Sequence, residues 1–412
     1  MTSPENGSLS PSGRGSGRGA SQQPTESRLF VFAGGGTGGH LAPGVAVATE
    51  LRRREPGCRI RFVGSGRPIE ERMLGPTGYA LTAHDAPPLA QIKRRPWHFL
   101  TAHWRAIRDI RREFQTDRPA AVIGLGGFAS VPVVIAAQRE SIPVLLLEQN
   151  VIPGRANWWL ARRHPICVTF DETREHLPRR AVCHVTGNPL REEILALYSS
   201  TSPQPLGATA GLPSSEILPG KHTSGQAGSA TQPKTLLILG GSHGSRQINE
   251  SAFNAVRNLR EQLATWHIIH QTGPDGAEQA RRIYSQCHLS ATAEPFFDDL
   301  PRLYPQTTLA ISRAGATTLT ELAAAGIPSI LLPYPLAAAD HQTRNADAFA
   351  NAGAAILIDN PTRTSEPLNL TDALEELVAA SERLSEMSIA ARNLAHPDAT
   401  RVVTDLLLAS MQ

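Results

Sequence analysis

Short apolar runs alternate with longer amphipathic stretches along the chain from residue 28 onward. Most runs are bounded by Gly, Pro or polar residues, which is typical of strands buried on both faces of a parallel sheet. Their alternation with helical patterns predicts sheets that are covered by helices. In the first half of the chain, the predicted strands are Arg28–Ala33, Ile60–Val63, Ala121–Leu125, Val144–Leu147, Ile166–Phe170 and Val182–Val185.

The pattern stops between Ser199 and Pro233, where 21 of 35 residues are Gly, Pro, Ser or Thr. It then restarts, and in each half the first strand runs into a Gly-rich turn. We therefore predict an α/β protein with two Rossmann-like, doubly wound parallel-sheet domains that face each other across a cleft. In the second half, the predicted strands are Leu236–Leu239, Trp266–His270, a strand near Ala293, Leu309–Ser312, Ser329–Leu332 and Ala354–Ile358.

The composition sets the predicted domain boundaries. Residues 1–27 are rich in Ser, Gly and Pro and lack an apolar core, so we predict a disordered tail and no signal peptide. An N-terminal domain is expected over 28–198, a flexible linker or insertion over 199–233, and a C-terminal domain over 234–412. The sequence leaves open whether the last helix packs back on the N-terminal domain.

Charge and cysteine content exclude several classes of protein. The 412 residues carry a formal charge of only +3, which does not favour a nucleic-acid partner. No run approaches the ~20 apolar residues that a membrane-spanning helix needs. The four cysteines form no C-x-x-C pair, which favours a reducing cytoplasm over a disulfide scaffold and predicts no metal site. We expect no cofactor.

Three Gly-rich turns follow predicted strands, at Gly34–His40, Gly124–Ser130 and Gly240–Ser245. A Gly-rich turn that opens a helix presents free N–H groups and the positive end of the helix dipole, which suits a phosphate or diphosphate. None carries the lysine of a Walker loop. The missing lysine argues against an ATPase. The second strand ends in Gly64-Ser65-Gly66 and not in the acidic residue of a dinucleotide-binding fold, which argues against an NAD-dependent enzyme.

A fourth candidate anion site opens at Gly315, where small residues and two hydroxyls begin a predicted helix. Glu321 follows about one turn inside that helix. A carboxylate accepts two hydrogen bonds at once, as a ribose diol requires, while the helix start can hold the attached diphosphate. The simpler alternative is that Glu321 only complements the helix dipole.

The chain resembles the MurG-type N-acetylglucosaminyltransferases of bacterial peptidoglycan synthesis, which belong to the GT-B superfamily. Eight motifs occur in that family's order: GGGTGGH, GLGGFASVP, LLLEQNVIPGRAN, TGNPLR, LGGSHGSRQIN, EPFFDDL, SRAGATTLTELAAAGIP and DHQTRNA. The resemblance implies a GT-B fold and an inverting hexosyltransferase. It would move N-acetylglucosamine from its UDP donor to the C4 hydroxyl of the muramyl sugar of lipid I, giving lipid II.

The resemblance also implies roles for individual residues. In the C-terminal half, Ser242, Ala316, Thr317 and Thr318 would meet the donor diphosphate, Glu321 the ribose, and the backbone around Phe297 the uracil edge. Arg191 would reach across from the N-terminal half, and Gln342 and Asn345 would bind the sugar hydroxyls. The acceptor side of the cleft would be lined by Thr37, Gly38, Asn150, His40 and Glu148, and Gly39 would contact the donor.

Inversion in one displacement needs a base for the acceptor hydroxyl and stabilisation for the departing diphosphate. His40 is the first candidate base because an imidazole titrates near neutral pH. The alternative is that it caps a helix or orients a loop. Glu148 is the second candidate base, or else positions His40 or the acceptor. Arg191 and helix N-termini can stabilise UDP without a metal.

Two motif residues depart from the family pattern. Phe128 stands where many relatives have Tyr, and His341 where they often have Gln, so one sugar contact is in doubt. Three other functions stay open: a GT-B transferase of another specificity, such as a diacylglycerol sugar transferase; a UDP-sugar 2-epimerase; and a non-catalytic lipid-carrier binding protein. The identity of the glycosylated acceptor would distinguish the first alternative, and isomerisation of the sugar without an acceptor would distinguish the second. Binding of lipid I without release of UDP would distinguish the third.

Between Lys93 and Arg112 seven Lys or Arg residues face one acid, Asp109. Aromatic and apolar residues are interleaved with them, a mixture that settles at lipid head groups. We predict peripheral binding to an anionic membrane at the cytoplasmic face of the inner membrane, with cell-wall and division proteins as further partners implied by the resemblance. The predicted contact residues are Lys93, Arg94, Arg95, Trp97, Phe99 and Leu100. The alternative is that Trp104, Ile107, Ile110 and Phe114 pack inward as ordinary core.

Overall fold

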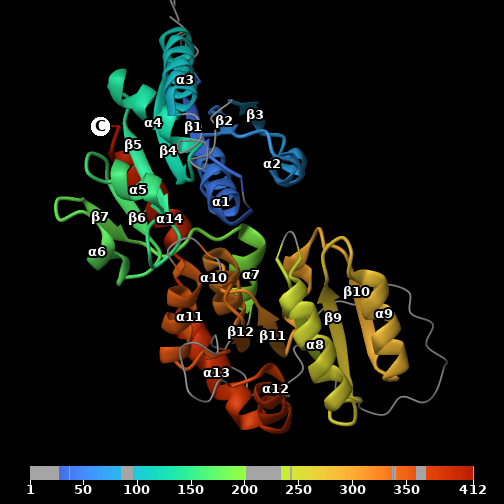
Figure 1. The fold of residues 1–412 in the computed structure, drawn as a ribbon. Coiled ribbons are helices and arrows are strands. Elements are labelled where there is room, and N and C mark those ends of the chain that lie inside the picture. The colour runs from blue at the N-terminus through green and yellow to red at the C-terminus, as the bar shows by residue number, and fades with distance from the viewer. Residues whose placement is uncertain are drawn as a thin grey trace, which may run out of the picture.

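Two α/β domains, each built on one parallel sheet, make up the computed structural model (Figure 1). The structure describes residues 27–36, 38–84, 96–200, 233–241, 244–335, 337, 340–358 and 368–411. Within these ranges, the two sheets and their flanking helices follow the doubly wound pattern that the sequence predicts.

The N-terminal sheet has seven parallel strands in the order β3-β2-β1-β4-β5-β6-β7. Side chains alternate along β1, so that Phe30 and Phe32 pack on one face while Val31 and Ala33 pack on the other. Both faces are therefore buried under helices, as a parallel sheet requires. The strands are β1 (Leu29–Gly34), β2 (Arg59–Gly64), β3 (Ala80–Ala83), β4 (Pro119–Gly126), β5 (Val144–Glu148), β6 (Ile166–Val168) and β7 (Cys183–Val185).

Within the described ranges, seven α-helices connect or follow these strands. They are α1 (Gly38–Arg54), α2 (Pro68–Leu74), α3 (Pro96–Thr116), α4 (Ser130–Arg139), α5 (Arg155–Leu160), α6 (Thr173–His176) and α7 (Glu192–Ser200). The first helix begins at Gly38, within the first Gly-rich turn, which places its N-terminus at the carboxyl edge of the sheet. Ligands of open α/β sheets bind at that edge.

The C-terminal sheet repeats the design with six parallel strands in the order β10-β9-β8-β11-β12-β13. Its strands are β8 (Lys234–Leu239), β9 (Trp266–Gln271), β10 (Ser290–Glu294), β11 (Leu309–Ser312), β12 (Ser329–Leu331) and β13 (Ala355–Leu357). Its helices are α8 (Arg246–Asn258), α9 (Ala277–Gln286), α10 (Ala316–Ala325), α11 (His341–Asn351), α12 (Leu370–Ala379) and α13 (Ser381–Asn393).

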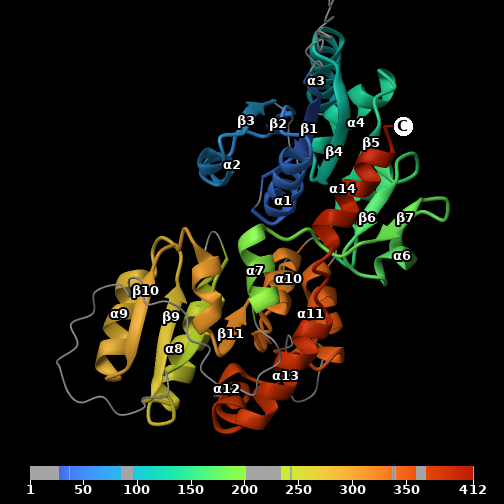
Figure 2. The same ribbon diagram turned by 180° about the vertical axis from the view of Figure 1, so that it is seen from behind.

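The chain crosses between the domains twice (Figure 2). Helix α7 packs on α10, and Leu190 and Ile194 join the core around Leu237 and Leu239 of β8. The N-terminal domain therefore ends before the predicted boundary at residue 198, because the apolar residues after Gly187 are buried by the C-terminal sheet. The last helix, α14 (Ala399–Ala409), returns to the N-terminal domain.

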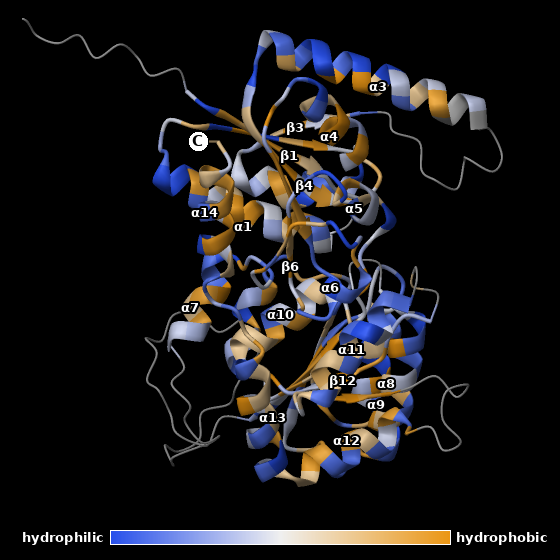
Figure 3. Cartoon of the chain, turned by 90° about the vertical axis from the view of Figure 1, so that its left-hand side faces the viewer, coloured by the Kyte–Doolittle hydropathy of each residue, from blue (hydrophilic) through white to orange (hydrophobic). Residues whose placement is uncertain are grey.

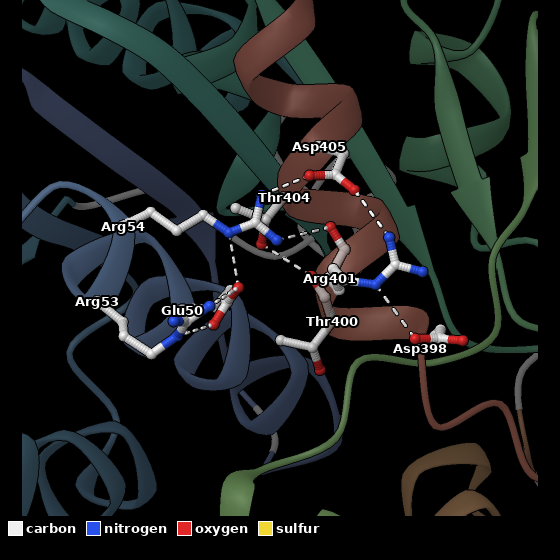
Figure 4. A network of polar contacts seen from close by, with 8 residues as sticks. All are labelled: Glu50, Arg53, Arg54, Asp398, Thr400, Arg401, Thr404 and Asp405. Carbon is white, nitrogen blue, oxygen red and sulfur yellow. Dashed lines mark hydrogen bonds and ion pairs between the residues drawn. The ribbon is translucent and has the colours of Figure 1, made fainter.

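Helix α14 is held on α1 by apolar packing and by a polar network. Val403 and Leu407 are buried in the same core as Phe30. Arg54 of α1 forms ion pairs with Glu50 of its own helix and with Asp405 of α14 (Figure 4). The C-terminus of the chain is thus part of the N-terminal domain, an arrangement that the sequence left open.

Candidate active site

Two helix N-termini meet between the domains. Helix α1 starts at Gly38 and helix α10 starts at Ala316. The Thr317 hydroxyl donates a hydrogen bond of 2.7 Å to the carbonyl oxygen of Gly39. The positive ends of both helix dipoles therefore point at one region, which favours anionic groups such as diphosphates.

His40 lies in the first turn of α1, half-buried at this junction. A Cβ built on Gly126, the last residue of β4, would lie 3.4 Å from Cδ2 of His40, so the imidazole packs against the second Gly-rich turn. Burial lowers the pKa of His40 below 6.5; the nearby Glu148 carboxylate acts to raise it and the His341 side chain to lower it. The imidazole is therefore neutral at neutral pH and able to accept a proton.

Glu148 ends β5 and is 3% exposed. Its Oε1 accepts hydrogen bonds from the backbone N–H and the side-chain amide of Asn150, at 3.0 and 3.1 Å. Its Oε2 accepts from the Gly154 N–H and the Asn157 amide, both at 2.9 Å. The structure thus places Glu148 close enough to His40 for its charge to act on the imidazole, and four donors from the following loop and from α5 surround its carboxylate.

Asn345 of α11 links the two domains. It is fully buried, and its Oδ1 accepts a hydrogen bond of 2.9 Å from the Val151 N–H. Its Nδ2 donates to Asn150 Oδ1 and to the Ala314 carbonyl, each at 3.1 Å. The residue expected to bind a sugar hydroxyl therefore bridges protein groups in this conformation.

Glu321 of α10 lies between two protein donors and is 6% exposed. Arg191 Nη2 donates to its Oε1 and the Tyr304 hydroxyl to its Oε2, each at 2.9 Å. Burial and the Glu321 charge raise the pKa of Tyr304 well above 10, so this hydroxyl keeps its proton. Within the described residues Arg191 Nε is buried without a hydrogen-bond partner.

Gln271, the last residue of β9, is a site residue that the sequence reasoning missed. Its Oε1 accepts a hydrogen bond of 3.1 Å from the Phe297 N–H, and its Nε2 donates one of 3.0 Å to the Gly241 carbonyl. The N–H expected near the uracil edge is therefore engaged by Gln271. The signal was a polar residue that ends a buried strand beside a Gly-rich turn.

Arg72 of α2 and Phe296 form another contact between the domains. The guanidinium lies 4.8 Å from the centre of the Phe296 ring, within the range of a cation–π interaction. A residue of the N-terminal domain thus reaches the segment that neighbours Phe297. Nothing in the sequence pattern pairs these two residues.

The remaining expected site residues either take no part in the contacts described above or fall outside the described ranges. Gln342 Oε1 accepts a hydrogen bond of 2.9 Å from the Tyr334 N–H. Thr318 is half-buried at the start of α10, and Ala316 is buried. The predictions for Thr37, Ser242, Lys93, Arg94 and Arg95, and for the side chain of Phe99, fall outside what the structure describes.

The predicted membrane segment corresponds to α3, which packs on α4. Trp97, Leu100 and Trp104 are 79%, 57% and 58% exposed. Farther along the helix Ile107, Ile110 and Phe114 are buried in the core. The alternative of an inward apolar stripe therefore holds for the later residues and not for Trp104.

The described ranges contain neither a cluster of candidate metal ligands nor a helix that could span a membrane. Nowhere in these residues do three or more His, Cys, Asp or Glu side chains gather as metal ligands would. Among the helices of the same ranges, none has both the length and the apolarity to cross a bilayer.

Two family models cover most of the two domains. The glycosyltransferase family 28 N-terminal domain matches residues 30–165, and the glycosyltransferase family 28 C-terminal domain matches residues 235–403. Among solved structures, the MurG of Acinetobacter baumannii is 29% identical with a TM-score of 0.67, covering 93% of this chain and 99% of that one. A UDP-GlcNAc 2-epimerase from Neisseria meningitidis, 14% identical with a TM-score of 0.61, shares the fold and covers 93% of this chain and 100% of that one.

Curated relatives carry one printed name, UDP-N-acetylglucosamine–N-acetylmuramyl-(pentapeptide) pyrophosphoryl-undecaprenol N-acetylglucosamine transferase. The relative from Geotalea uraniireducens is 36% identical over 383 residues, covering 91% of this chain and 96% of that protein. The relative from Trichlorobacter lovleyi is 35% identical over 391 residues, covering 93% and 98%. With the fold, both family 28 domains and this identity over nearly the whole length, the chain belongs to the MurG family of GT-B glycosyltransferases.

Proposed function

We propose that the protein transfers N-acetylglucosamine from UDP-N-acetylglucosamine to the C4 hydroxyl of the muramyl sugar of lipid I, and so makes lipid II. The observation that carries this proposal is the 36% identity, over more than nine-tenths of both chains, to a relative named for this transfer. The two helix N-termini that meet at Gly39 and Thr317 supply the electrostatics for two substrates that each carry a diphosphate.

The donor is proposed to lie on the C-terminal domain. The ribose hydroxyls would donate to Glu321, and the diphosphate would lie at the N-terminus of α10 near Ala316 and Thr318. Arg191 supports this arrangement because one of its nitrogens already contacts Glu321 and its buried Nε has no partner in the described residues. A guanidinium here can contact both the ribose-binding carboxylate and a phosphate oxygen.

The chemistry is proposed to be a single displacement with inversion. The acceptor O4 attacks C1 of N-acetylglucosamine, the bond from C1 to the UDP oxygen breaks, and the O4 proton passes to His40. The neutral, partly buried imidazole supports this role. Glu148 is better suited to hold the loop and the charge beside His40, because its two oxygens already accept four hydrogen bonds.

The direct test is UDP release from UDP-N-acetylglucosamine, measured with and without lipid I. Release that depends on lipid I, with a glycosylated lipid product, is the expected result. Isomerisation of the sugar without an acceptor would indicate the epimerase reaction of the structural neighbours instead. Lipid I binding without UDP release would indicate a carrier-binding protein.

We further propose that the N-terminal half of α3 rests on the cytoplasmic face of an anionic membrane. The apolar stripe of α3 continues without a break from buried Ile107 to exposed Trp104, Leu100 and Trp97. Figure 3 shows α3 running past α4, and this part of the stripe is exposed among the residues that the structure describes. Exposed Arg105 and Arg108 flank it, and basic residues near anionic lipid contribute about 1 kcal/mol each.

Sedimentation with vesicles that contain phosphatidylglycerol tests the membrane proposal. Wild-type protein should bind at low salt, and the triple change of Trp97, Leu100 and Trp104 to Ser should release it. The matched control is Ile389→Ser in α13 of the C-terminal domain, which removes an apolar side chain of 54% exposure. Equal binding by the triple variant and the control would place the membrane contact elsewhere.

A further inference from the structure

Glu70 is a fully buried carboxylate in α2 that the proposed chemistry does not use. Its Oε1 accepts hydrogen bonds from the Gly36 N–H at 2.6 Å and the Ser65 hydroxyl at 2.8 Å. The Ser65 N–H contacts both carboxylate oxygens, at 3.0 and 3.1 Å. The N–H groups of Gly66 and Arg67 donate to Oε2 at 2.8 and 3.3 Å. These five donors are uncharged N–H and O–H groups, and they replace the hydration of the carboxylate.

Helix capping explains only part of this arrangement. Glu70 is the third residue of α2, and its contact with the Arg67 N–H is the ordinary capping contact of a Glu at that position. The contact with Gly36 is shorter and joins residues 34 positions apart. Arg67 Nη1 also donates 3.0 Å to the Gly36 carbonyl. The segment around α2 therefore holds both polar groups of Gly36, in the first Gly-rich turn.

Two glycines admit the carboxylate. A Cβ on Gly35 would lie 2.3 Å from Oε1 of Glu70, and a Cβ on Gly64 would lie 2.4 Å from Oε2. Neither glycine has a positive φ, so the backbone conformation alone does not demand glycine at these positions. The close approach of Glu70 does demand it, because a side chain at either position would displace the carboxylate.

We propose that Glu70 is a positioning residue, an internal anion that sets the shape of the first Gly-rich turn for the acceptor. This inference rests on the proposed function for its substrate. By taking the Gly36 N–H, Glu70 directs one donor of the turn inward and fixes the backbone that leads into α1 and His40. A turn fixed before binding loses less conformational entropy when lipid I arrives. The N–H groups at the start of α1 then remain for the acceptor diphosphate.

The experiment displaces the carboxylate in two independent ways. Glu70→Gln keeps the shape but turns an NH₂ group toward N–H donors. Gly64→Ala adds a methyl group whose three nearest atoms all belong to Glu70, and it changes no residue of the Gly-rich turn. Gly57→Ala, with nothing within 4 Å of the added Cβ, is the glycine control. Glu50→Gln, which weakens ion pairs to Arg53 and Arg54 in α1 of the same domain, is the carboxylate control.

Steady-state kinetics on lipid I and calorimetry with UDP are the main measurements. Both displacing variants should raise the KM for lipid I tenfold or more and leave the Kd for UDP within twofold. The double variant should be no worse than the poorer single variant, because both changes remove the same contact. Hydrogen exchange of the Gly36 amide should quicken in both. The controls should lower stability at most, with unchanged kinetics.

The outcomes separate this inference from the proposed function. Wild-type protein that releases no UDP with lipid I would contradict the proposed function itself. An active wild type together with folded variants of unchanged KM for lipid I would overturn the role of Glu70. Equal losses in UDP affinity and lipid I use would also overturn it, since they indicate general disruption. Gly64→Ala decides the matter alone if Glu70→Gln does not fold.

Discussion

Glu321→Ala is the change that most directly tests the donor site. Free Glu321 already accepts hydrogen bonds from Arg191 and Tyr304, each 2.9 Å long. Two ribose hydroxyls that bind it must therefore share or replace these donors, so the net gain is closer to one charged hydrogen bond than to two. One such bond is worth about 1.5–3 kcal/mol, which predicts a loss of about tenfold to 150-fold in kcat/KM for the donor.

The same change also affects stability, so the two effects must be separated. Removal of the carboxylate leaves the buried Tyr304 hydroxyl unpaired, at a cost of about 1–3 kcal/mol. Arg191 is 29% exposed and can turn to water, so its contribution is smaller. A lower Tm is therefore expected, and rates must be measured well below it.

Initial rates over a range of UDP-N-acetylglucosamine, at fixed saturating lipid I, give the donor kcat/KM. Titration calorimetry with UDP gives the binding constant without chemistry, and thermal unfolding gives the stability. A Glu321→Ala variant with a lower Tm but an unchanged donor kcat/KM and an unchanged UDP affinity would refute the role of Glu321 in donor binding. Glu321 would then serve only to hold Arg191 against α10.

Three further predictions concern the base, metals and pH. His40→Ala should lower kcat by about 10²–10⁴ with UDP affinity unchanged, and a near-normal kcat would move proton acceptance to another group. Activity should survive EDTA; loss that Mg²⁺ restores would reveal a ligand set that we have missed. Burial lowers the pKa of His270 to about 3 from 6.5. Between those two pKa values only the unfolded chain gains this proton. The contribution of His270 to the free energy of unfolding is therefore complete above pH 6.5 and is lost toward pH 3. The loss is about 1.4 kcal/mol per pH unit and about 5 kcal/mol in all. Urea unfolding of His270→Gln should show a pH slope shallower by that amount, and an unchanged slope would contradict the assignment.

Strands were predicted correctly where a run of apolar residues marks a buried strand. Leu309–Ser312 forms β11 with the predicted bounds, because a strand covered on both faces needs an unbroken apolar run. Ala80–Ala83 was missed. It lies at the sheet edge as β3, with two of its four residues exposed and none buried, so its strand character comes from pairing with β2 rather than from its own pattern.

The site was predictable only in part, for a related reason. The Gly-rich turns and the place of Glu321 in a helix follow from local sequence, and the resemblance identified His40 and Glu148. The contact of Glu70 with Gly36 and the contact of Arg191 with Glu321 join residues 34 and 130 positions apart. Such pairs arise when segments that are distant in the sequence pack together. Hydrophobic periodicity and motif spacing describe only local sequence, so they do not predict these pairs.

The hydrogen bonds of the site without substrate determine whether a substitution there strengthens or weakens UDP binding. Buried polar groups must find partners, and here Glu321, Asn345 and the Phe297 N–H have found them within the protein. A substrate that binds these three groups must therefore share or replace contacts that they make within the protein. Removal of a competing protein donor should then differ from removal of the substrate-binding group.

Tyr304→Phe removes such a competitor. It deletes the hydroxyl that occupies Oε2 of Glu321 and leaves the carboxylate in place. The Kd for UDP should stay level or fall, although the Tm drops because one hydrogen bond is lost, whereas Glu321→Ala should raise the Kd. UDP calorimetry on the two variants side by side measures the contrast. If Tyr304→Phe weakens UDP binding as much as Glu321→Ala does, the hydroxyl orients the carboxylate for the ribose, and the idea of competition is wrong.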